Sequence, residues 1–374
     1  MTRRLKALSL CLLLLLAPIA TLAVEGEKSD SLTTTAIGDT TGKPRRNLFV
    51  KAYDLLVGYL DSYTFDTAYI EPSRFYYTLM LQQSANFEHY TISGLGEKPQ
   101  RLSFVPDHTY RIGAYFGWHG LFLGFSINAD ELFSDRNGNN KKKEYFINLY
   151  GQKLGADFFY RQSGNDFTIR STRGFYRGGE KYDFNGTPFS GLTVKSKGLN
   201  VYYVFNNDHF SYPAAYAQTT IQRISRGTLV GGISWSSHEL GFDPTKLPLE
   251  IKNDLSDDLK FRKVRYTDFN INFGYAFNWV FADNWLLAVA LTPAVAYKVA
   301  DIRIENSIYD QRYKNINFDF IARTGLVYNN NRFFIGANAV AHIYQYYQEN
   351  FSLTDNFGVV NIYAGFNFGR RKKN

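Results

Sequence analysis

Alternation of apolar and polar side chains between Asp268 and Phe281 constrains the fold of this chain more than any other feature. One set of alternate positions is apolar and mostly aromatic: Phe269, Ile271, Phe273, Tyr275, Phe277, Trp279 and Phe281. The positions between them are polar or small: Asp268, Asn270, Asn272, Gly274, Ala276 and Asn278. Successive side chains of a strand point to opposite faces, whereas a helix would distribute the asparagines around its circumference. The segment is therefore predicted to be a strand with one apolar and one polar face.

The same period-two pattern recurs along most of the chain. It is found in segments 75–84, 110–118, 121–128, 285–298, 316–326, 333–344 and 360–368. Pro293 lacks a backbone donor, so we expect a β-bulge at that point of its strand. The pattern in 144–162 changes phase near Gly151–Gly155, which indicates a second bulge.

Composition decides what the apolar face contacts. Aromatic residues make up 17% of the chain, with 28 Tyr and 32 Phe. After residue 23, no segment approaches the roughly 20 apolar residues of a membrane-spanning helix. A soluble β-sandwich also alternates, but it would not usually line one face with seven large apolar side chains in succession. We therefore predict an all-β fold, a transmembrane antiparallel up-and-down β-barrel whose apolar face contacts lipid.

Topology gives a strand count. Bacterial barrels have an even number of strands, short periplasmic turns and longer outer loops. The tight turns at 119–120, 282–283 and 329–331, together with segment 208–221, are assigned to the periplasmic end. The polar segments 239–263, 301–313 and 349–355 are assigned to the outer end. A turn at Ser163–Asn165 would divide strands 144–162 and 166–175, which gives about twelve strands, with ten and fourteen as alternatives.

The first 64 residues have a different character. Residues 1–23 read as a cleavable signal peptide, because Arg3, Arg4 and Lys6 precede an apolar run and Ala23 supplies a small residue at the cleavage position. Cys11, the only cysteine, lies within that run, so the exported chain should have no thiol. Residues 24–44 are expected to be a disordered leader. Residues 45–64 show helical spacing and are expected to form a short periplasmic helix or plug, before a barrel over 65–374.

Two short motifs carry a family resemblance, Phe65–Ile70 (FDTAYI) and Phe210–Tyr216 (FSYPAAY). With the arrangement that follows them, they resemble the Bacteroidetes proteins that contain the uncharacterised DUF4421 domain. The resemblance implies a Gram-negative outer-membrane protein without an established activity. One departure concerns the terminal aromatic residue that commonly signals outer-membrane assembly, because Phe368 is followed by six further residues here.

The polar face supplies the candidate site residues. Six charged or titratable side chains should project into the lumen: Arg111, Asp268, Lys298, Asp319, Arg323 and His342. In an open pore they would set ion or solute selectivity, and in a closed barrel they would pair and fill the interior. Tryptophans near strand ends should anchor the barrel at the two membrane interfaces: Trp118, Trp235, Trp279 and Trp285.

No motif indicates catalysis. The six histidines are dispersed without metal-ligand spacing, so we expect no metal and no cofactor. Ser237 and His238 are adjacent and should face opposite sides of a strand, so they cannot form a nucleophile–base pair. The net charge is +8, but its basic runs are not interleaved with aromatic residues, which excludes a nucleic-acid platform.

These observations favour a non-enzymatic barrel, either a narrow passive pore or a structural envelope protein. An alternative is an adhesion or partner-docking barrel that acts through outer loops 131–143, 176–197 and 239–263. A lipid-modifying barrel enzyme ranks lower. The expected partners are outer-membrane lipid, lipopolysaccharide and the outer-membrane assembly machinery, with a solute or protein partner left open.

Overall fold

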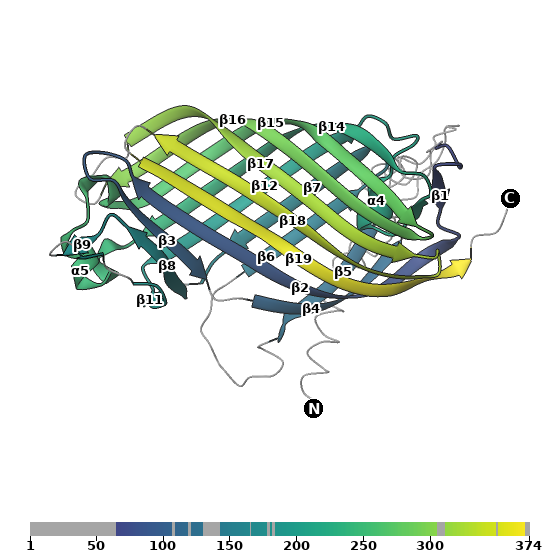
Figure 1. The fold of residues 1–374 in the computed structure, drawn as a ribbon, viewed down its shortest axis with the longest axis horizontal. Helices are drawn as coiled ribbons and strands as arrows, with labels where there is room; N and C mark the ends of the chain where they lie inside the picture. The colour runs from purple at the N-terminus through teal and green to yellow at the C-terminus, as the bar shows by residue number, and fades with distance from the viewer. Residues whose placement is uncertain are drawn as a thin grey trace, which may run out of the picture. The chain divides into compact units, whose positions relative to one another are not determined.

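The computed structural model describes residues 65–370 apart from 107–108, 119–120, 130–142, 165, 178–179, 182–183, 305–310 and 349–350. These residues form antiparallel strands that lie side by side and curl into a barrel (Figure 1). Within the part of the chain that is described, no helix is long and apolar enough to cross a membrane. The expectations for the signal peptide, the leader and the 45–64 helix fall outside the described residues.

The barrel wall contains twelve of the described strands. They are β2 (Phe75–Gly94), β4 (Thr109–Trp118), β5 (Leu121–Asn128), β6 (Lys143–Tyr150), β7 (Leu154–Gln162), β12 (Leu192–Val204), β14 (Arg226–Phe242), β15 (Phe261–Ala282), β16 (Trp285–Ile304), β17 (Gln311–Asn329), β18 (Phe333–Gln348) and β19 (Phe351–Arg370). The order around the wall is β5-β4-β2-β19-β18-β17-β16-β15-β14-β12-β7-β6. Among the described residues, no backbone ladder joins β5 to β6 at the ends of this path.

The number of wall strands agrees with the predicted twelve, but the chain is divided into strands differently. Segment 144–162 is not one bulged strand but the hairpin β6–β7, in which Tyr150 pairs with Gly155. Gly151 permits this reversal, because a Cβ there would lie 2.3 Å from the Leu154 carbonyl oxygen. The predicted strand 166–175 is β8 (Phe167–Arg173), which pairs with β3 (Gln100–Pro106) beyond the end of the wall.

The predicted bulge at Pro293 is also wrong. Asn272 pairs with Ala294 and Tyr275 pairs with Leu291, so the register of β15 on β16 is the same on both sides of the proline. Gly274 lies opposite this point, and a Cβ there would lie 2.1 Å from the Leu291 carbonyl oxygen. The two strands approach each other closely at Gly274, and in this way they tolerate the backbone N–H that Pro293 lacks. No extra residue is inserted into either strand.

The alternation predicted from the sequence is confirmed. On β15 the exposed fraction falls from 72% at Ile271 to 1% at its neighbour Asn272. All seven apolar positions from Phe269 to Phe281 are exposed, and the positions between them are buried or half-buried. The same sorting on the other wall strands produces an outward apolar belt around a polar interior, which is the pattern of a transmembrane barrel.

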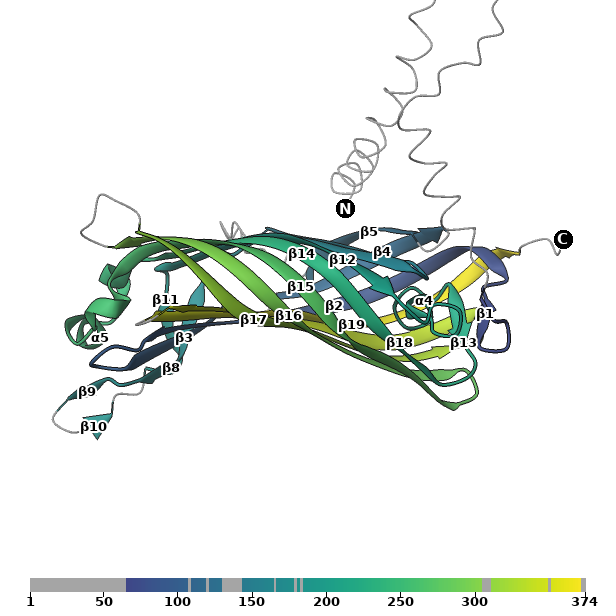
Figure 2. The ribbon, with the colours of Figure 1, turned by 90° about the horizontal axis from the view of Figure 1, so that it is seen from above.

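One end of the barrel carries the tight turns and a segment that packs against the inner side of the wall. The segment between β12 and β14 folds back over this end as α4 (Tyr212–Tyr216) and β13 (Thr220–Gln222), and β13 pairs with β1 (Ile70–Pro72) (Figure 2). Tyr212 and Tyr216 are buried against wall residues such as Tyr202 and Val327. We refer to residues 205–225 as the end plug.

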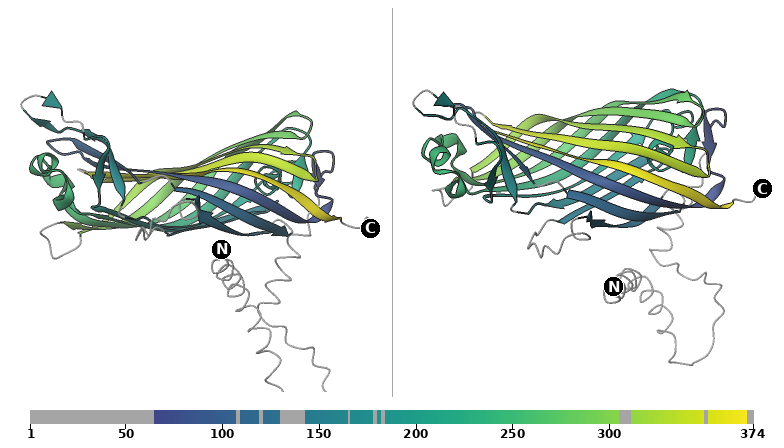
Figure 3. Two further views of the ribbon diagram at one scale, coloured as in Figure 1. Left: turned by 90° about the horizontal axis from the view of Figure 1, so that it is seen from below. Right: turned by 60° about the horizontal axis from the view of Figure 1, so that its bottom comes forward.

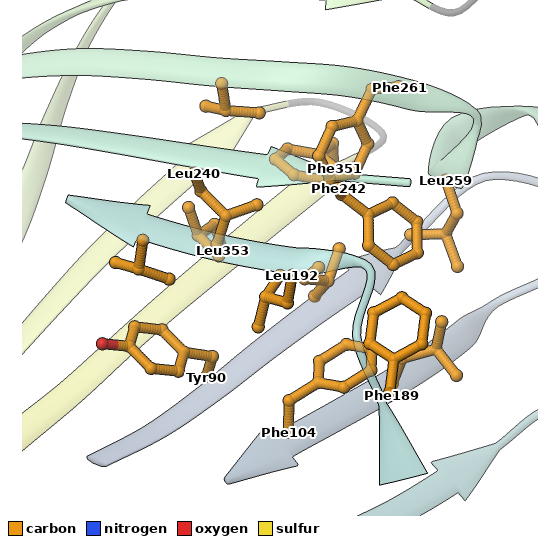
Figure 4. Packing of buried hydrophobic residues seen from close by; sticks show 14 of the residues in the cluster. Tyr90, Phe104, Phe189, Leu192, Leu240, Phe242, Leu259, Phe261, Phe351 and Leu353 are labelled. Atoms are coloured by element: carbon orange, nitrogen blue, oxygen red, sulfur yellow. The ribbon is translucent and has the colours of Figure 1, made fainter. Parts of the chain in front are cut away.

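The opposite end, here called the outer end, carries smaller elements that lie beyond the long wall strands (Figure 3). It has a hydrophobic core of its own (Figure 4). The smaller elements there are β3, β8, β9 (Tyr176–Arg177), β10 (Glu180–Lys181), β11 (Thr187–Phe189), η1 (Pro244–Lys246), α5 (Leu249–Asn253) and η2 (Asp257–Leu259). Phe104, Phe189 and Phe242 pack together, with ring centroids 5.0 to 6.1 Å apart. Leu259 and Phe351 complete the cluster, which connects the wall strands to the loops that cover them.

Several wall strands extend beyond the apolar belt into this end. The predicted outer loops 301–313 and 349–355 are therefore too long, because β16 continues to Ile304 and β19 begins at Phe351. A tilted membrane strand needs only about 9 to 11 residues to cross the bilayer. Strands of 20 residues, such as β2 and β16, therefore also build structure outside the bilayer.

Candidate functional site

Between the end plug and the outer-end core lies a set of buried charged side chains that we call the interior charged cluster. Its members are Glu88 (β2), Arg161 (β7), His238 (β14), Asp268 (β15), Lys298 (β16), Asp319 (β17) and Asp355 (β19). Each is at most 8% exposed and points inward because it occupies a polar position of the alternation. Seven strands thus place one charged side chain each into a common volume.

Lys298 is the centre of one half of the cluster. Its Nζ donates to Asp268 Oδ2 and to both carboxylate oxygens of Asp319, all at 3.0 Å. Asp319 also accepts from the Asn270 side chain at 3.2 Å and from the Gln345 backbone N–H at 3.1 Å. Lys298 and Asp268 are 0% exposed, so water contributes little to their solvation and the ion pairs must replace it.

Arg161 is the centre of the other half. Its Nη2 lies 2.6 Å from Glu88 Oε2 and donates to the Tyr90 hydroxyl at 2.7 Å, while Tyr90 donates to Glu88 at 2.6 Å. Its Nη1 lies 3.8 Å from Asp355 Oδ1. The guanidinium also covers the Phe357 ring, 3.7 Å from the ring centroid, which adds a cation–π contact.

His238 connects the two halves. Its Nδ1 lies 3.3 Å from Asp355 Oδ2, and its Nε2 lies 3.0 Å from Ser236 Oγ and 3.8 Å from Asp268 Oδ2. Ser236 Oγ donates to Asp268 at 3.2 Å. The imidazole ring stacks on Tyr266 with a centroid distance of 4.6 Å and an interplanar angle of 7°.

Ser236, His238 and Asp355 have the composition of a hydrolytic triad but not its working geometry. The Nδ1 atom of His238 makes no hydrogen bond within the described structure despite its proximity to Asp355. Ser236 is 2% exposed and is directed to a carboxylate. A nucleophile needs an accessible oxygen whose proton passes to an oriented base. This group instead links two strands of the wall, β14 and β19.

A separate ion pair lies nearer the end plug. Arg323 on β17 pairs with Asp157 on β7 across the barrel interior. Asp157 also accepts from Asn200, which in turn accepts from Asn272, at 3.0 and 2.9 Å. This chain of contacts joins β7, β12, β15 and β17 through the lumen.

The structure brings together three of the predicted lumen residues, Asp268, Lys298 and Asp319. Arg323 is buried in its separate pair with Asp157. His342 is 9% exposed and stacks on Phe357, 4.9 Å between ring centroids. Arg111 lies on β4 opposite Ser84 and is half-buried.

The predicted anchor tryptophans lie on wall strands. Trp279 is 51% exposed and Trp285 36%, and both flank the tight turn between β15 and β16. Trp235 is half-buried near the outer boundary of the belt, with Lys197 Nζ 5.6 Å from its ring. Trp118 ends β4, and its side chain falls outside the described residues.

Sequence reasoning missed Glu88, Arg161, His238, Asp355 and Asp157. Glu88 continues the alternation of Gln82 and Ser84 by two further pairs, so its inward position was accessible from the pattern. His238 shares a face with Ser236, not with Ser237. Asp355 falls in the predicted loop 349–355, and Asp157 and Arg161 lie in segment 144–162, where the β6–β7 turn interrupts the alternation as a bulge would. Their convergence depends on register, which the alternation alone does not specify.

Chemically, the charged side chains of the interior pair with one another and are not arranged for charge transfer. Four carboxyl groups face the basic side chains of Arg161 and Lys298, and His238 lies between two of the carboxyl groups. Among the described residues, no group of three or more His, Cys, Asp or Glu side chains has the arrangement of a metal site.

The fold and its interior define a transmembrane antiparallel β-barrel whose inward side chains form buried ion pairs and packed rings. The chain belongs to the family described as a domain of unknown function, DUF4421, whose sequence profile matches residues 64–368. No curated protein matches the sequence.

Solved structures of similar arrangement have little sequence in common with this chain. The outer-membrane protease OmpT from Escherichia coli is 7% identical with a TM-score of 0.39, over 83% of this chain and 100% of that one. The translocator domain of the autotransporter NalP from Neisseria meningitidis is 8% identical with a TM-score of 0.30, over 86% and 95%. The toluene transporter TodX from P. putida is 8% identical with a TM-score of 0.21, over 79% and 91%. TM-scores this low transfer no activity to this chain.

Proposed function

We propose that this protein is a sealed, non-enzymatic outer-membrane barrel that acts as a structural envelope protein and not as a passive pore. Export through a signal peptide over residues 1–23 is part of the proposal. The observation that carries it is the filled interior, in which the central charged side chains Lys298, Asp268 and Asp319 are at most 1% exposed.

Three layers support a closed lumen. The end plug buries Tyr212 and Tyr216 inside one mouth, and the outer-end core buries Phe104 and Phe242 inside the other. Between them, the interior charged cluster cross-links facing strands. In open porins the polar interior lines a water-filled channel, whereas here the polar groups contact one another.

Single-channel recording in planar bilayers tests the sealed barrel directly. The purified full-length exported chain should show no conductance above the protein-free bilayer. Protein that is folded, as judged by heat-modifiable gel migration, and that shows reproducible unitary steps would overturn the proposal. A variant that lacks residues 206–224, replaced by a short Gly-Ser turn, should also remain non-conducting, because two of the three layers are intact.

A second candidate function, partner docking at the outer end, is favoured by a specific observation. Strands β14 and β15 continue beyond the belt to carry a folded loop, in which Leu247, Ile251 and Leu259 are buried in the outer-end core. A loop with its own core presents a fixed surface, which suits recognition. Replacing residues 244–258 by a Gly-Ser linker should abolish adhesion to a partner while the barrel still folds, and retained adhesion would reject this candidate.

The lower-ranked enzymatic hypothesis receives no support from the interior. A lipid-modifying enzyme needs its nucleophile within reach of the lipid, whereas Ser236 is 2% exposed and faces the lumen. Unchanged membrane-lipid composition in a deletion strain is the outcome that we expect.

A further inference from the structure

The apolar belt has a well-defined outer boundary on one face of the barrel. Backbone register aligns one outward residue from each of five neighbouring strands, Leu199, Trp235, Phe269, Tyr297 and Ile316. Phe269 is 57% exposed and Ile316 71% exposed. This row is apolar or aromatic at every position, as expected where a barrel meets the headgroups of a bilayer.

Beyond this row, lysines appear among the outward positions. The next aligned row is Lys197, Ser237, Thr267, Val299 and Lys314, and the row after it includes Lys195, Glu239, Arg265 and Asp301. A strand rises about 3.3 Å per residue, so the first basic row lies about 7 Å along the strands from the last apolar row. That distance places it in the headgroup layer.

The acidic residue on β14 in this region is already neutralised. Glu239 is paired with both Lys263 and Arg265, at 2.7 and 2.8 Å. By contrast, no ion pair among the described residues engages Lys195, Lys197 or Lys314. These three cations lie at the two edges of the face formed by β12, β14, β15, β16 and β17. We call them the basic rim.

On the strands that continue around the wall, β18, β19 and β2, one aligned outward row is polar and uncharged, with Gln345, Thr354 and Thr91. Exposed arginines recur on the neighbouring strands β3 and β8, at Arg101, Arg170 and Arg173. The basic rim is therefore defined by its position directly beyond the apolar row.

We infer that the basic rim binds the phosphate groups of an anionic glycolipid of the outer leaflet, with its acyl chains lying on the adjacent apolar belt. This inference rests on the proposed outer-membrane location. Charge complementarity identifies the headgroup, because lysine ammonium groups bind phosphate as point charges. The apolar row directly below them identifies a lipid as the occupant, since a soluble phosphate ligand would gain nothing from Phe269 and Ile316.

Binding of lipid A to the folded full-length exported chain in detergent tests this assignment. Bisphosphorylated lipid A in mixed micelles is titrated against the protein, with phosphatidylglycerol micelles and inorganic phosphate as comparison ligands. In the variant Lys195→Gln/Lys197→Gln/Lys314→Gln the affinity for lipid A should fall about tenfold, because each exposed charge contact is individually weak. The control Lys98→Gln/Lys246→Gln/Lys252→Gln removes the same charge from outer-end loops and should bind within twofold of the parent.

The possible outcomes test the glycolipid site separately from the outer-membrane location on which it rests. Equal losses in both triple variants, no loss in either, or equal affinity for phosphatidylglycerol and lipid A would overturn the basic rim as a glycolipid site. Tight binding of inorganic phosphate alone would overturn the lipid occupant. Membrane fractionation of cells tests the outer-membrane location separately, because it does not depend on the three lysines.

Discussion

At the scale of single residues, Lys298 shows what holds the interior together. Its ammonium group is fully buried between Asp268 and Asp319. Taking such charges out of water costs several kcal/mol per ion, and only good geometry and further hydrogen bonds offset it. Removing one member of the group is therefore far more damaging than removing an exposed charge.

Substitution of Lys298 by Met should destabilise the folded barrel by about 3 to 5 kcal/mol, because two carboxylates would lose their buried counter-charge. Urea unfolding from lipid vesicles measures the change. Lys143→Met, at an exposed position of β6, is the matched control and should change stability by less than about 0.5 kcal/mol. The variant Lys298→Met/Asp268→Asn/Asp319→Asn should recover part of the loss, and no recovery would contradict the electrostatic explanation.

Glu71 on β1 makes a pH-dependent contribution outside the membrane-spanning part of the barrel. Burial alone would raise the pKa of its carboxyl group, but hydrogen bonds from Arg223 and Arg74 outweigh burial and lower the pKa below the ordinary value of 4.5. Asn331 also donates to Glu71, at 3.1 Å, so the carboxylate ties β1 to the turn between β17 and β18.

Because the pKa of Glu71 is lower in the folded state, its stabilisation is present above pH 4.5 and is lost as the pH falls through the folded-state pKa. At pH 7 the parent should be more stable than Glu71→Gln by about 0.5 to 1 kcal/mol, and the two should converge in strong acid. Equilibrium unfolding at pH 7 and pH 3 makes the comparison, with Glu250→Gln on α5 as the exposed control. A difference that grows on acidification would reject this account.

At the scale of elements, the end plug is held by hydrogen bonds to buried backbone groups. Gln222 accepts from the Ser211 backbone N–H at 2.9 Å and from Asn278 at 3.1 Å, and donates to the His209 carbonyl at 2.7 Å. Gln152 on the β6–β7 turn donates to the Phe210 carbonyl at 2.8 Å. A segment fixed in this way is a permanent part of the barrel, since each lost hydrogen bond would leave a buried polar group unsatisfied.

Replacing Gln222 by Leu should loosen the end plug without unfolding the wall. Five polar groups lose a hydrogen-bond partner, namely the Ser211 N–H, the Asn278 amide and the carbonyls of Tyr69, His209 and Ile224. We therefore expect faster amide exchange over residues 206–222 and a loss of about 2 kcal/mol in stability. Hydrogen–deuterium exchange followed by peptide mass analysis resolves the two regions. Ile224→Ala, an exposed substitution in the same segment, should leave exchange unchanged, and equal acceleration in strands β15 to β17 would argue against a separate plug.

Elements are also where sequence reasoning succeeds and fails most clearly. The alternation located β15, β16 and β19, because a strand between lipid and a polar lumen must sort its side chains at every step. It mistook the β6–β7 turn for a bulge, since both interrupt the period and only the paired partner distinguishes them. It also shortened β16 and β19, because their outer segments face water and a protein core, where apolar-out sorting no longer applies.

At the scale of the whole molecule, the two ends of the barrel predict an orientation. Short turns connect the strands at the end with the plug, whereas α5 and the longer connections lie at the outer end. In bacterial barrels the short turns are periplasmic and the long loops extracellular. The outer end, with its separate core and the basic rim below it, should therefore face the cell exterior.

Single-cysteine labelling on intact cells checks this orientation. With Cys11, the only native cysteine, replaced by Ser, a membrane-impermeant maleimide should label Lys252→Cys on α5. It should label Asn330→Cys, in the β17–β18 turn, only after the outer membrane is permeabilised. Labelling of Asn330→Cys alone in intact cells would reverse the assignment.

The sequence by itself determined that this chain forms strands, which face of most strands contacts lipid, and that residues such as Asp268, Lys298 and Asp319 point inward. These properties follow from local chemistry, because alternation and composition are written in consecutive residues. Only the tertiary structure decided that the inward charges pair across the lumen, that Arg161, His238 and Asp355 join them, and that the end plug and the outer-end core lie at the two ends of the barrel. The physical reason is register: a side chain's partners in a barrel lie on strands up to hundreds of residues away, and shifting one strand by two residues preserves every local pattern while changing every contact.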